Sequence, residues 1–238
     1  MRGESMIPGG KALLRAIDRR IEVPDPSRHG LRWRRGKSDA AYHRNKRILD
    51  LSICVLVFPI ALPIFLICAA MVKASSPGPI FFVQERTGIG GRRFQMLKFR
   101  TMIPGAANMK DELEESNIMG GPDFKLTKDP RVTVVGDLLR RSSLDEAPQI
   151  WNVLRGDMSL VGPRPTSFSA ASYELWHTER LEAMPGLTGL WQVAGRGEID
   201  FDDRVRLDIA YVRNRSLPLD LLILLRTVPA VLSQRGAY

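Results

Sequence analysis

Hydrophobic and polar residues are grouped in blocks along this chain of 238 residues, and the blocks differ in length and period. The longest apolar block runs from Leu51 to Val72 and contains no charged side chain. A run of about 22 apolar residues is long enough to cross a lipid bilayer as a helix. The alternative is a buried helix of a soluble core, but apolar runs in such helices are usually shorter. We therefore expect a membrane helix within residues 44–74.

Shorter blocks after this helix predict a β-hairpin and several helices. Two strands are expected at Ile80–Gln84 and Arg93–Phe99, joined by a glycine-rich turn at Thr87–Arg92. Helices are expected at 109–116, 132–141, 144–154, 167–184, 202–214 and 217–232. The last of these is strongly apolar but too short to span a bilayer, which favours an interfacial or packed helix.

Two prolines, Pro59 and Pro63, lie in the middle of the long apolar block. Each removes a backbone hydrogen bond, so together they should bend the helix sharply. Basic residues flank the block on both sides, with Lys46 and Arg47 before it and Lys73 after it. A spanning helix would place one basic flank outside, against the positive-inside bias. The pattern favours a re-entrant hairpin over a true span, and the span remains the alternative.

The predicted fold class is α+β and helix-rich, with a re-entrant membrane helix hairpin, interfacial amphipathic helices and a small β-hairpin. Charge divides the chain further, because residues 1–50 hold thirteen Lys and Arg against six Asp and Glu, within a total of +9. We expect a basic, flexible arm over 1–43, the membrane helix over 44–74 and a cytoplasmic catalytic domain over 75–238. Trp33 and Tyr42 are the arm's aromatics and no reader motif accompanies them, so nucleic-acid binding is not expected.

Cysteine and histidine give no sign of a metal centre. Cys54 and Cys68 both lie in the apolar block, on opposite sides of the prolines, where buried thiols are the better interpretation. The histidines are scattered without ligand spacing, at positions 29, 43 and 177. We expect neither zinc nor a disulfide framework.

The most informative polar feature is the acidic pair Asp145-Glu146. Pro148 follows it, and proline is tolerated in the first turn of a helix, so the pair should lie at a helix start. Helix starts favour anions such as phosphate groups. A simpler interpretation is available, because Ser143 and Glu146 also have the spacing of a capping box. For an isolated motif of this kind, capping alone is the commoner explanation.

From about Lys46 to Leu225 the chain resembles the bacterial sugar transferase family of monotopic polyprenyl-phosphate phosphoglycosyl transferases. Eight motifs carry the resemblance, in the order of the family. They are K-R-I-L-D at 46–50, S-P-G-P-I-F-F at 76–82, Q-E-R-T-G at 84–88, L-K-F-R-T-M at 97–102, K-D-P-R-V-T at 128–133, S-L-D-E-A-P-Q at 143–149, N-V-L-R-G-D-M-S-L-V-G-P-R-P at 152–165 and P-G-L-T-G-L-W-Q-V-A-G-R at 185–196.

The resemblance implies transfer of a sugar-1-phosphate from a UDP-sugar to polyprenyl (undecaprenyl) phosphate, with release of UMP. It implies that Asp145 is the nucleophile that takes the phospho-sugar, that Glu146 is its partner, and that both help to bind Mg²⁺. Other positions are assigned by the same resemblance to substrate binding: Arg140 and Arg164 to phosphate, Arg196 to the nucleotide, and Gln192, Lys98 and Arg100 to the substrates in general.

The resemblance also implies a place at the bilayer, on the cytoplasmic face of the inner membrane. One departure affects the membrane helix. The family usually has Ser-Pro at the bend, where this chain has Leu62-Pro63, and a leucine has no hydroxyl for a freed carbonyl. A lipid-pyrophosphate phosphatase and an inactive family member remain alternatives. The sugar, the glycan pathway, a homodimer and the role of the arm are left open by the sequence.

Overall fold

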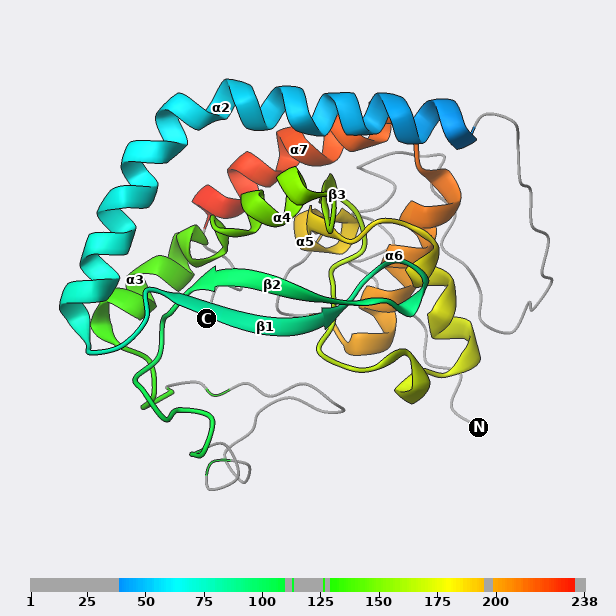
Figure 1. Cartoon of the computed structure of the whole chain (residues 1–238). Helices are drawn as coiled ribbons and strands as arrows, with labels where there is room; N and C mark the ends of the chain where they lie inside the picture. The colour runs from blue at the N-terminus through cyan, green and yellow to red at the C-terminus, as the bar shows by residue number, and fades with distance from the viewer. Residues whose placement is uncertain (1–38, 110–112, 114–125, 127–128, 195–198, 234–238) are drawn as a thin grey trace.

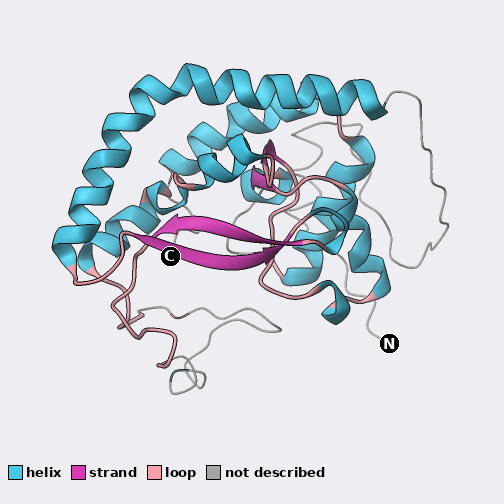
Figure 2. Ribbon diagram, viewed as in Figure 1, coloured by secondary structure: helices cyan, strands magenta, loops and turns pink. Residues whose placement is uncertain are grey.

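The computed structural model describes residues 39–109, 113, 126, 129–194 and 199–233. Most of the N-terminal arm, most of the helix expected at 109–116 and the site candidate Arg196 lie outside the described residues. The described part is helix-rich with two small two-stranded sheets, as the α+β prediction required (Figure 2).

A single long helix, α2, runs from Asp39 to Ser75 and bends in its middle (Figure 1). It begins earlier than the expected Arg44, so residues 39–43 belong to the helix. Pro59 and Pro63 lie inside it, and both cysteines on it are free and buried. By length and composition α2 is able to cross a membrane.

The two arms of α2, on either side of the bend, pack against the rest of the molecule in different ways. The N-terminal arm of α2 makes both polar and apolar contacts. The Lys46 ammonium lies 3.0 Å from Asp220, Tyr42 donates to the same carboxylate at 2.9 Å, and Cys54 joins the main hydrophobic core. The C-terminal arm of α2 packs in a second apolar cluster, where Cys68 and Val72 lie beside Phe99. Both arms are thus attached to one body.

Strands β1 (Phe81–Thr87) and β2 (Arg93–Phe99) form the predicted antiparallel hairpin, with Phe81 opposite Phe99 and Thr87 opposite Arg93. The turn between them contains the short 3₁₀ helix η1 (Ile89–Gly91). Its glycines are required, because Gly90 and Gly91 have φ of 61° and 80°.

Helix α3 (Val134–Arg141) begins with Thr133 as its N-cap, whose side chain accepts from the Gly136 amide. The acidic pair follows in a 3₁₀ turn, η3 (Leu144–Glu146), and helix α4 (Gln149–Arg155) begins after it. The expected helix start at Leu144 was therefore wrong, and so was the capping box. Ser143 has φ of 57° and makes no capping hydrogen bond, because it turns the chain between α3 and η3 in a left-handed conformation.

A two-stranded parallel sheet joins β3 (Ser159–Val161) to β4 (Gly186–Thr188). Two segments approach so closely here that side chains cannot fit between them. A Cβ on Gly162 would lie 2.2 Å from the Met184 carbonyl oxygen, and one on Gly186 would lie 2.1 Å from the Gly162 nitrogen. These glycines therefore allow the motifs at 152–165 and 185–196 to pack directly against each other.

The single helix expected at 167–184 was wrong, since the segment forms 3₁₀ helices η4 (Ala170–Ser172) and η5 (Leu175–Glu182). Its inward side chains include polar His177 and Arg180, which are placed by hydrogen bonds rather than by an apolar stripe. The helices that complete the fold are α5 (Leu190–Ala194), α6 (Phe201–Asn214) and α7 (Leu217–Leu232). The last two confirm the prediction.

Candidate active site

The acidic pair lies in the turn η3, between the end of α3 and the start of α4, and faces strand β2. Lys98 of β2 donates to Glu146 Oε1 at 2.8 Å. The guanidinium of Arg164 donates to both oxygens of the same carboxylate, at 3.0 Å to Oε2 and more closely to Oε1. A bidentate arginine and a lysine on one carboxylate fix its position and neutralise its charge.

The two carboxylates differ in how readily they take up a proton. Burial alone would raise the pKa of Glu146, but the charges and hydrogen bonds of Arg164 and Lys98 prevail and hold that pKa well below its usual value. Burial raises the pKa of Asp145, and the charge of Glu146 adds to the effect, while Lys98 and Arg140 offset part of it. Glu146 is therefore a fixed anion, and Asp145 is an anion of raised basicity.

The Asp145 carboxylate is also the less restrained of the two. Within the part of the chain that the structure describes, no hydrogen bond or ion pair fixes it, although the charges of Lys98, Arg140 and Arg164 act on it. Arg140 is itself oriented by a hydrogen bond from its Nε to Thr101 Oγ1 at 2.9 Å. A carboxylate that is basic, surrounded by cations and not already bound is suited to attack a phosphorus atom or to bind a cation.

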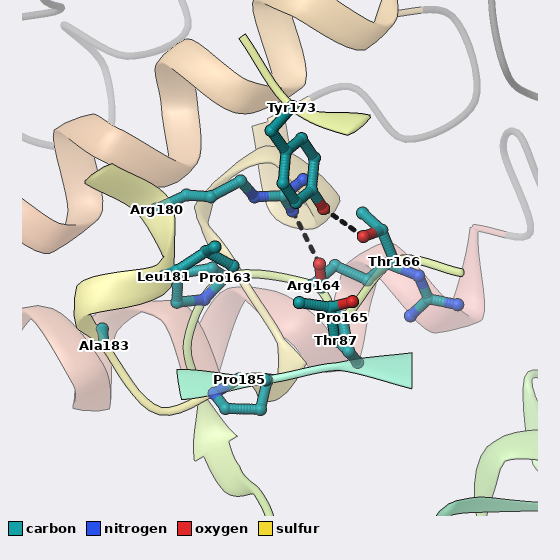
Figure 3. A pocket seen from close by; sticks show the side chains of 11 residues that line it. Thr87, Pro163, Arg164, Pro165, Thr166, Tyr173, Arg180, Leu181, Ala183 and Pro185 are labelled. Atoms are coloured by element: carbon teal, nitrogen blue, oxygen red, sulfur yellow. Dashed lines mark hydrogen bonds between the residues drawn. The ribbon is translucent and has the colours of Figure 1, made fainter. Parts of the chain in front are cut away.

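The loop that carries Arg164 is held from behind by a buried ion pair that the sequence did not reveal. Arg180 of η5 donates to the Arg164 carbonyl at 2.6 Å and pairs with Asp208 of α6. Figure 3 shows Arg180 pointing at this carbonyl, while the Arg164 side chain extends away from it. Burial raises the pKa of Asp208 to about 6, although Arg180 opposes the shift. An acidic residue among the apolar positions of α6 was the signal that could have identified it.

The other site residues predicted from the sequence do not join this group. Arg100 donates to Pro77 O at 2.7 Å and Ser76 O at 2.8 Å, so its guanidinium holds the turn that follows α2. Gln192 lies on α5 and donates to Leu187 O at 3.4 Å. The structure thus brings Asp145, Glu146, Lys98, Arg140 and Arg164 together.

A cavity of about 140 Å³ lies next to this group and shares Arg164 with it. Its lining combines guanidinium groups and aromatic rings: Arg86, Arg164, Arg180 and Arg204, with Phe168, Trp191 and Phe201.

Among the residues that the structure describes, the acidic pair alone offers oxygen ligands for a metal ion at this site. The described residues contain no group of three or more His, Cys, Asp or Glu side chains that could enclose a metal. The oxygens of Glu146 are shared with Lys98 and Arg164, whereas those of Asp145 are not. Mg²⁺ is commonly held by one or two carboxylates together with substrate phosphates and water. The donor set therefore fits Mg²⁺ bound jointly with a phosphate ligand.

Comparison with known proteins gives a family match over most of the chain. The family model described as bacterial sugar transferase matches residues 41–234. The exopolysaccharide production protein ExoY of Sinorhizobium fredii is 42% identical over 199 residues, covering 82% of this chain and 88% of that protein. The UDP-glucose:undecaprenyl-phosphate glucose-1-phosphate transferase of Caulobacter vibrioides is 43% identical, covering 81% of this chain and 72% of that protein. The undecaprenyl-phosphate galactose phosphotransferase of Salmonella typhimurium is 41% identical, covering 81% of this chain and 41% of that protein.

Proposed function

Since the chain belongs to the bacterial sugar transferase family, we propose that it transfers a sugar-1-phosphate from a UDP-sugar to undecaprenyl phosphate and releases UMP. Relatives named as undecaprenyl-phosphate sugar phosphotransferases support a phosphoglycosyl transferase activity. The name of the Sinorhizobium relative supports a role in making an exopolysaccharide or a similar glycan.

The observation that carries the proposal is the division of roles between the two adjacent carboxylates. Asp145 is the nucleophile: its oxygen forms a bond to the sugar-bearing phosphorus, and the bond from that phosphorus to the UMP oxygen breaks. UMP leaves with the electron pair. An oxygen of undecaprenyl phosphate then attacks the same phosphorus, and the bond to Asp145 breaks to regenerate the carboxylate.

The surrounding cations make attack by one anion on another feasible. Lys98 and Arg164 neutralise Glu146, so this second carboxylate adds little repulsion to the incoming diphosphate. Arg140, oriented by Thr101, places a further positive charge beside Asp145. Asp145 and Glu146 would hold Mg²⁺ with the donor phosphates, and the ion would supply charge neutralisation at the phosphate oxygens.

We propose further that α2 enters the inner membrane from the cytoplasmic face and returns to it at the bend. Two features support this topology. Both arms of α2 pack on the same body, and the side chains between them are apolar and exposed, including Val55, Leu56 and Ile60. A helix that ended on the opposite side of a bilayer could not make both sets of contacts at once. Helix α7 also exposes apolar side chains, Leu221, Leu225 and Val228, which suits it to lie in the interface.

The proposal is tested by UMP release. The full chain in detergent is incubated with undecaprenyl phosphate, Mg²⁺ and each member of a panel of UDP-sugars, alongside the Asp145→Asn variant. We expect release of UMP that depends on the acceptor in steady state and is lost in the variant. Mass spectrometry of the protein quenched without acceptor should show one sugar phosphate attached at Asp145. Release of inorganic phosphate from a polyprenyl pyrophosphate, with no UMP from any donor, would instead favour a phosphatase.

A further inference from the structure

The cavity beside the acidic pair has a lining that points to a specific part of the donor. Five segments build it: the end of β1, the loop after Pro163, η5, α5 and the start of α6. Its connection to the reaction site is Arg164, which lines the cavity and also binds Glu146. A ligand in this cavity therefore lies one side chain away from the acidic pair.

The charge of the lining is positive. None of the ten described lining residues is acidic, and four are arginines: Arg86, Arg164, Arg180 and Arg204. Two of the four are paired with carboxylates outside the lining, Arg164 with Glu146 and Arg180 with Asp208. Arginine is well suited to phosphate because its planar group offers several donors in a fixed arrangement. The cavity therefore favours a ligand with phosphate oxygens.

The same lining presents flat aromatic surfaces. The Arg204 guanidinium lies 5.4 Å from the centre of the Trp191 ring and 5.8 Å from that of Phe201. Phe168 packs edge-on against Phe201, with ring centres 5.8 Å apart. These contacts hold the rings in place without a ligand, so little side-chain freedom remains to be lost on binding. Aromatic and guanidinium planes of this kind stack on nucleobases.

We propose that this arginine–aromatic pocket binds the nucleotide part of the donor, a pyrimidine nucleoside phosphate, so that Arg164 lies between the nucleotide and the acidic pair. The inference rests on the proposed function. Of the two ends of a nucleotide-sugar, the nucleotide end combines a planar base with its own phosphate charge, whereas the sugar end beyond the shared diphosphate is uncharged. The pocket also lies among η5 and α6, away from the bend of α2, which fits a soluble ligand better than the lipid (Figure 1).

The test is UMP binding by isothermal titration calorimetry with the full chain in detergent, which needs no turnover. Arg204→Ala and Phe201→Leu should each weaken UMP binding about tenfold or more, the size expected for one lost stacking or charge contact. Phe201→Leu should weaken uridine binding as well, and Arg204→Ala should weaken pyrophosphate binding. Arg213→Ala is the matched control, since Arg213 lies on the same helix α6 and pairs with Glu179 at an exposed site. It should bind UMP like the unmodified protein.

Kinetics separate the failure of this inference from the failure of the proposed function. If UMP is released in turnover, both pocket variants should raise KM for the UDP-sugar about tenfold while kcat changes little. Normal UMP affinity and normal KM in folded Arg204→Ala and Phe201→Leu would overturn the pocket assignment and leave the transferase intact. An altered preference among UDP-sugars with unchanged UMP affinity would also overturn it, in favour of a sugar site. Tight UMP binding that the variants abolish, with no turnover on any donor, would support the pocket and reject the transferase.

Discussion

Two places where the chain interrupts regular helix, the turn at 143–148 and the bend in α2, are built in opposite ways. In the turn, the acidic side chain of Glu146 is bound by Lys98 and Arg164, so the protein itself supplies every partner. At the bend, the apolar side chains point outward, and Leu56 is 77% exposed. The turn is therefore preorganised by neighbouring side chains, whereas the exposed apolar side chains of the bend are suited to an apolar environment. Glu146 is thus held in place before substrate arrives, whereas the bend, on the proposed topology, would find its partners in the bilayer.

The largest effect is expected where the turn itself is altered. Asp145→Asn keeps the shape of the side chain and removes the nucleophile, so kcat for UMP release should fall about 10³-fold or more. The measurement is steady-state UMP release at saturating donor and acceptor. A loss of less than tenfold would show that another group attacks the phosphorus.

A smaller loss should follow when the bound carboxylate is changed. Glu146→Gln keeps the shape but removes the charge that Lys98 and Arg164 hold in place, and a loss of about 10²-fold in kcat is expected. Sugar-phosphate attachment at Asp145 should still be detected by mass spectrometry, only more slowly. Complete absence of the attached sugar phosphate after long incubation would assign the nucleophile's role to Glu146.

A charged substitution at the bend of α2 should weaken membrane binding without altering the reaction site. Leu56→Lys places a charge among exposed apolar side chains and should disfavour membrane insertion by about 3 kcal/mol, or roughly 10²-fold in partition. Leu175→Lys is the control, because Leu175 is also exposed, at 88%, but lies on η5. Flotation with vesicles measures both. Equal binding by the two variants would contradict a membrane role for the bend.

The pH dependence should follow Asp145 alone. Its pKa is raised by burial, so protonation removes the nucleophile as pH falls, while Glu146, whose pKa is lowered, stays ionised. The pH–rate profile of the first half-reaction should therefore have a single acid limb, along which the rate falls about tenfold per pH unit. The apparent pKa of this limb should lie above that of an ordinary aspartate. Rapid-quench UMP formation without acceptor avoids the titration of the acceptor phosphate. A limb at or below the ordinary value would contradict the burial argument.

The smallest effect concerns the attachment of α2 to the body. Tyr211 donates to Asp220 at 2.7 Å, and Asp220 in turn binds Tyr42 and Lys46 of α2. Tyr211→Phe should lower the free energy of unfolding by about 1–3 kcal/mol, because a buried carboxylate loses one of its donors. Thermal unfolding in detergent measures the loss. Tyr173→Phe, which removes a half-buried hydroxyl bound to Thr166, should cost less.

Sequence patterns predicted the parts of the fold that rest on local rules. The β2 strand, α3, α6 and α7 follow from hydrophobic period and turn residues, and their bounds agree closely with the structure. The predictions for the start of α4 and for the segment 167–184 were wrong. The left-handed conformation of Ser143 and the inward direction of Arg180 depend on tertiary contacts, and such contacts leave no periodic pattern in the sequence.

The candidate site was predicted only in part, because motifs in the sequence name residues but do not show where their side chains point. Family motifs supplied Asp145, Glu146, Lys98, Arg140 and Arg164, and the structure brings these five together. The motif that contains Arg100 was equally clear, but its guanidinium is directed to the turn after α2. An acidic residue at an apolar position of α6 marks Asp208 as unusual, but nothing local indicates that its partner is Arg180, 28 residues away in the chain.

The polar attachment of α2 also sets an order of events during synthesis on the ribosome. Tyr42 and its partner Asp220 are 178 residues apart, so α2 leaves the ribosome long before α7 exists. Until α7 has been translated, the N-terminal arm lacks the carboxylate that binds Tyr42 and Lys46. On the proposed topology, α2 is therefore available for insertion into the bilayer before the carboxylate that anchors its N-terminal half has been made.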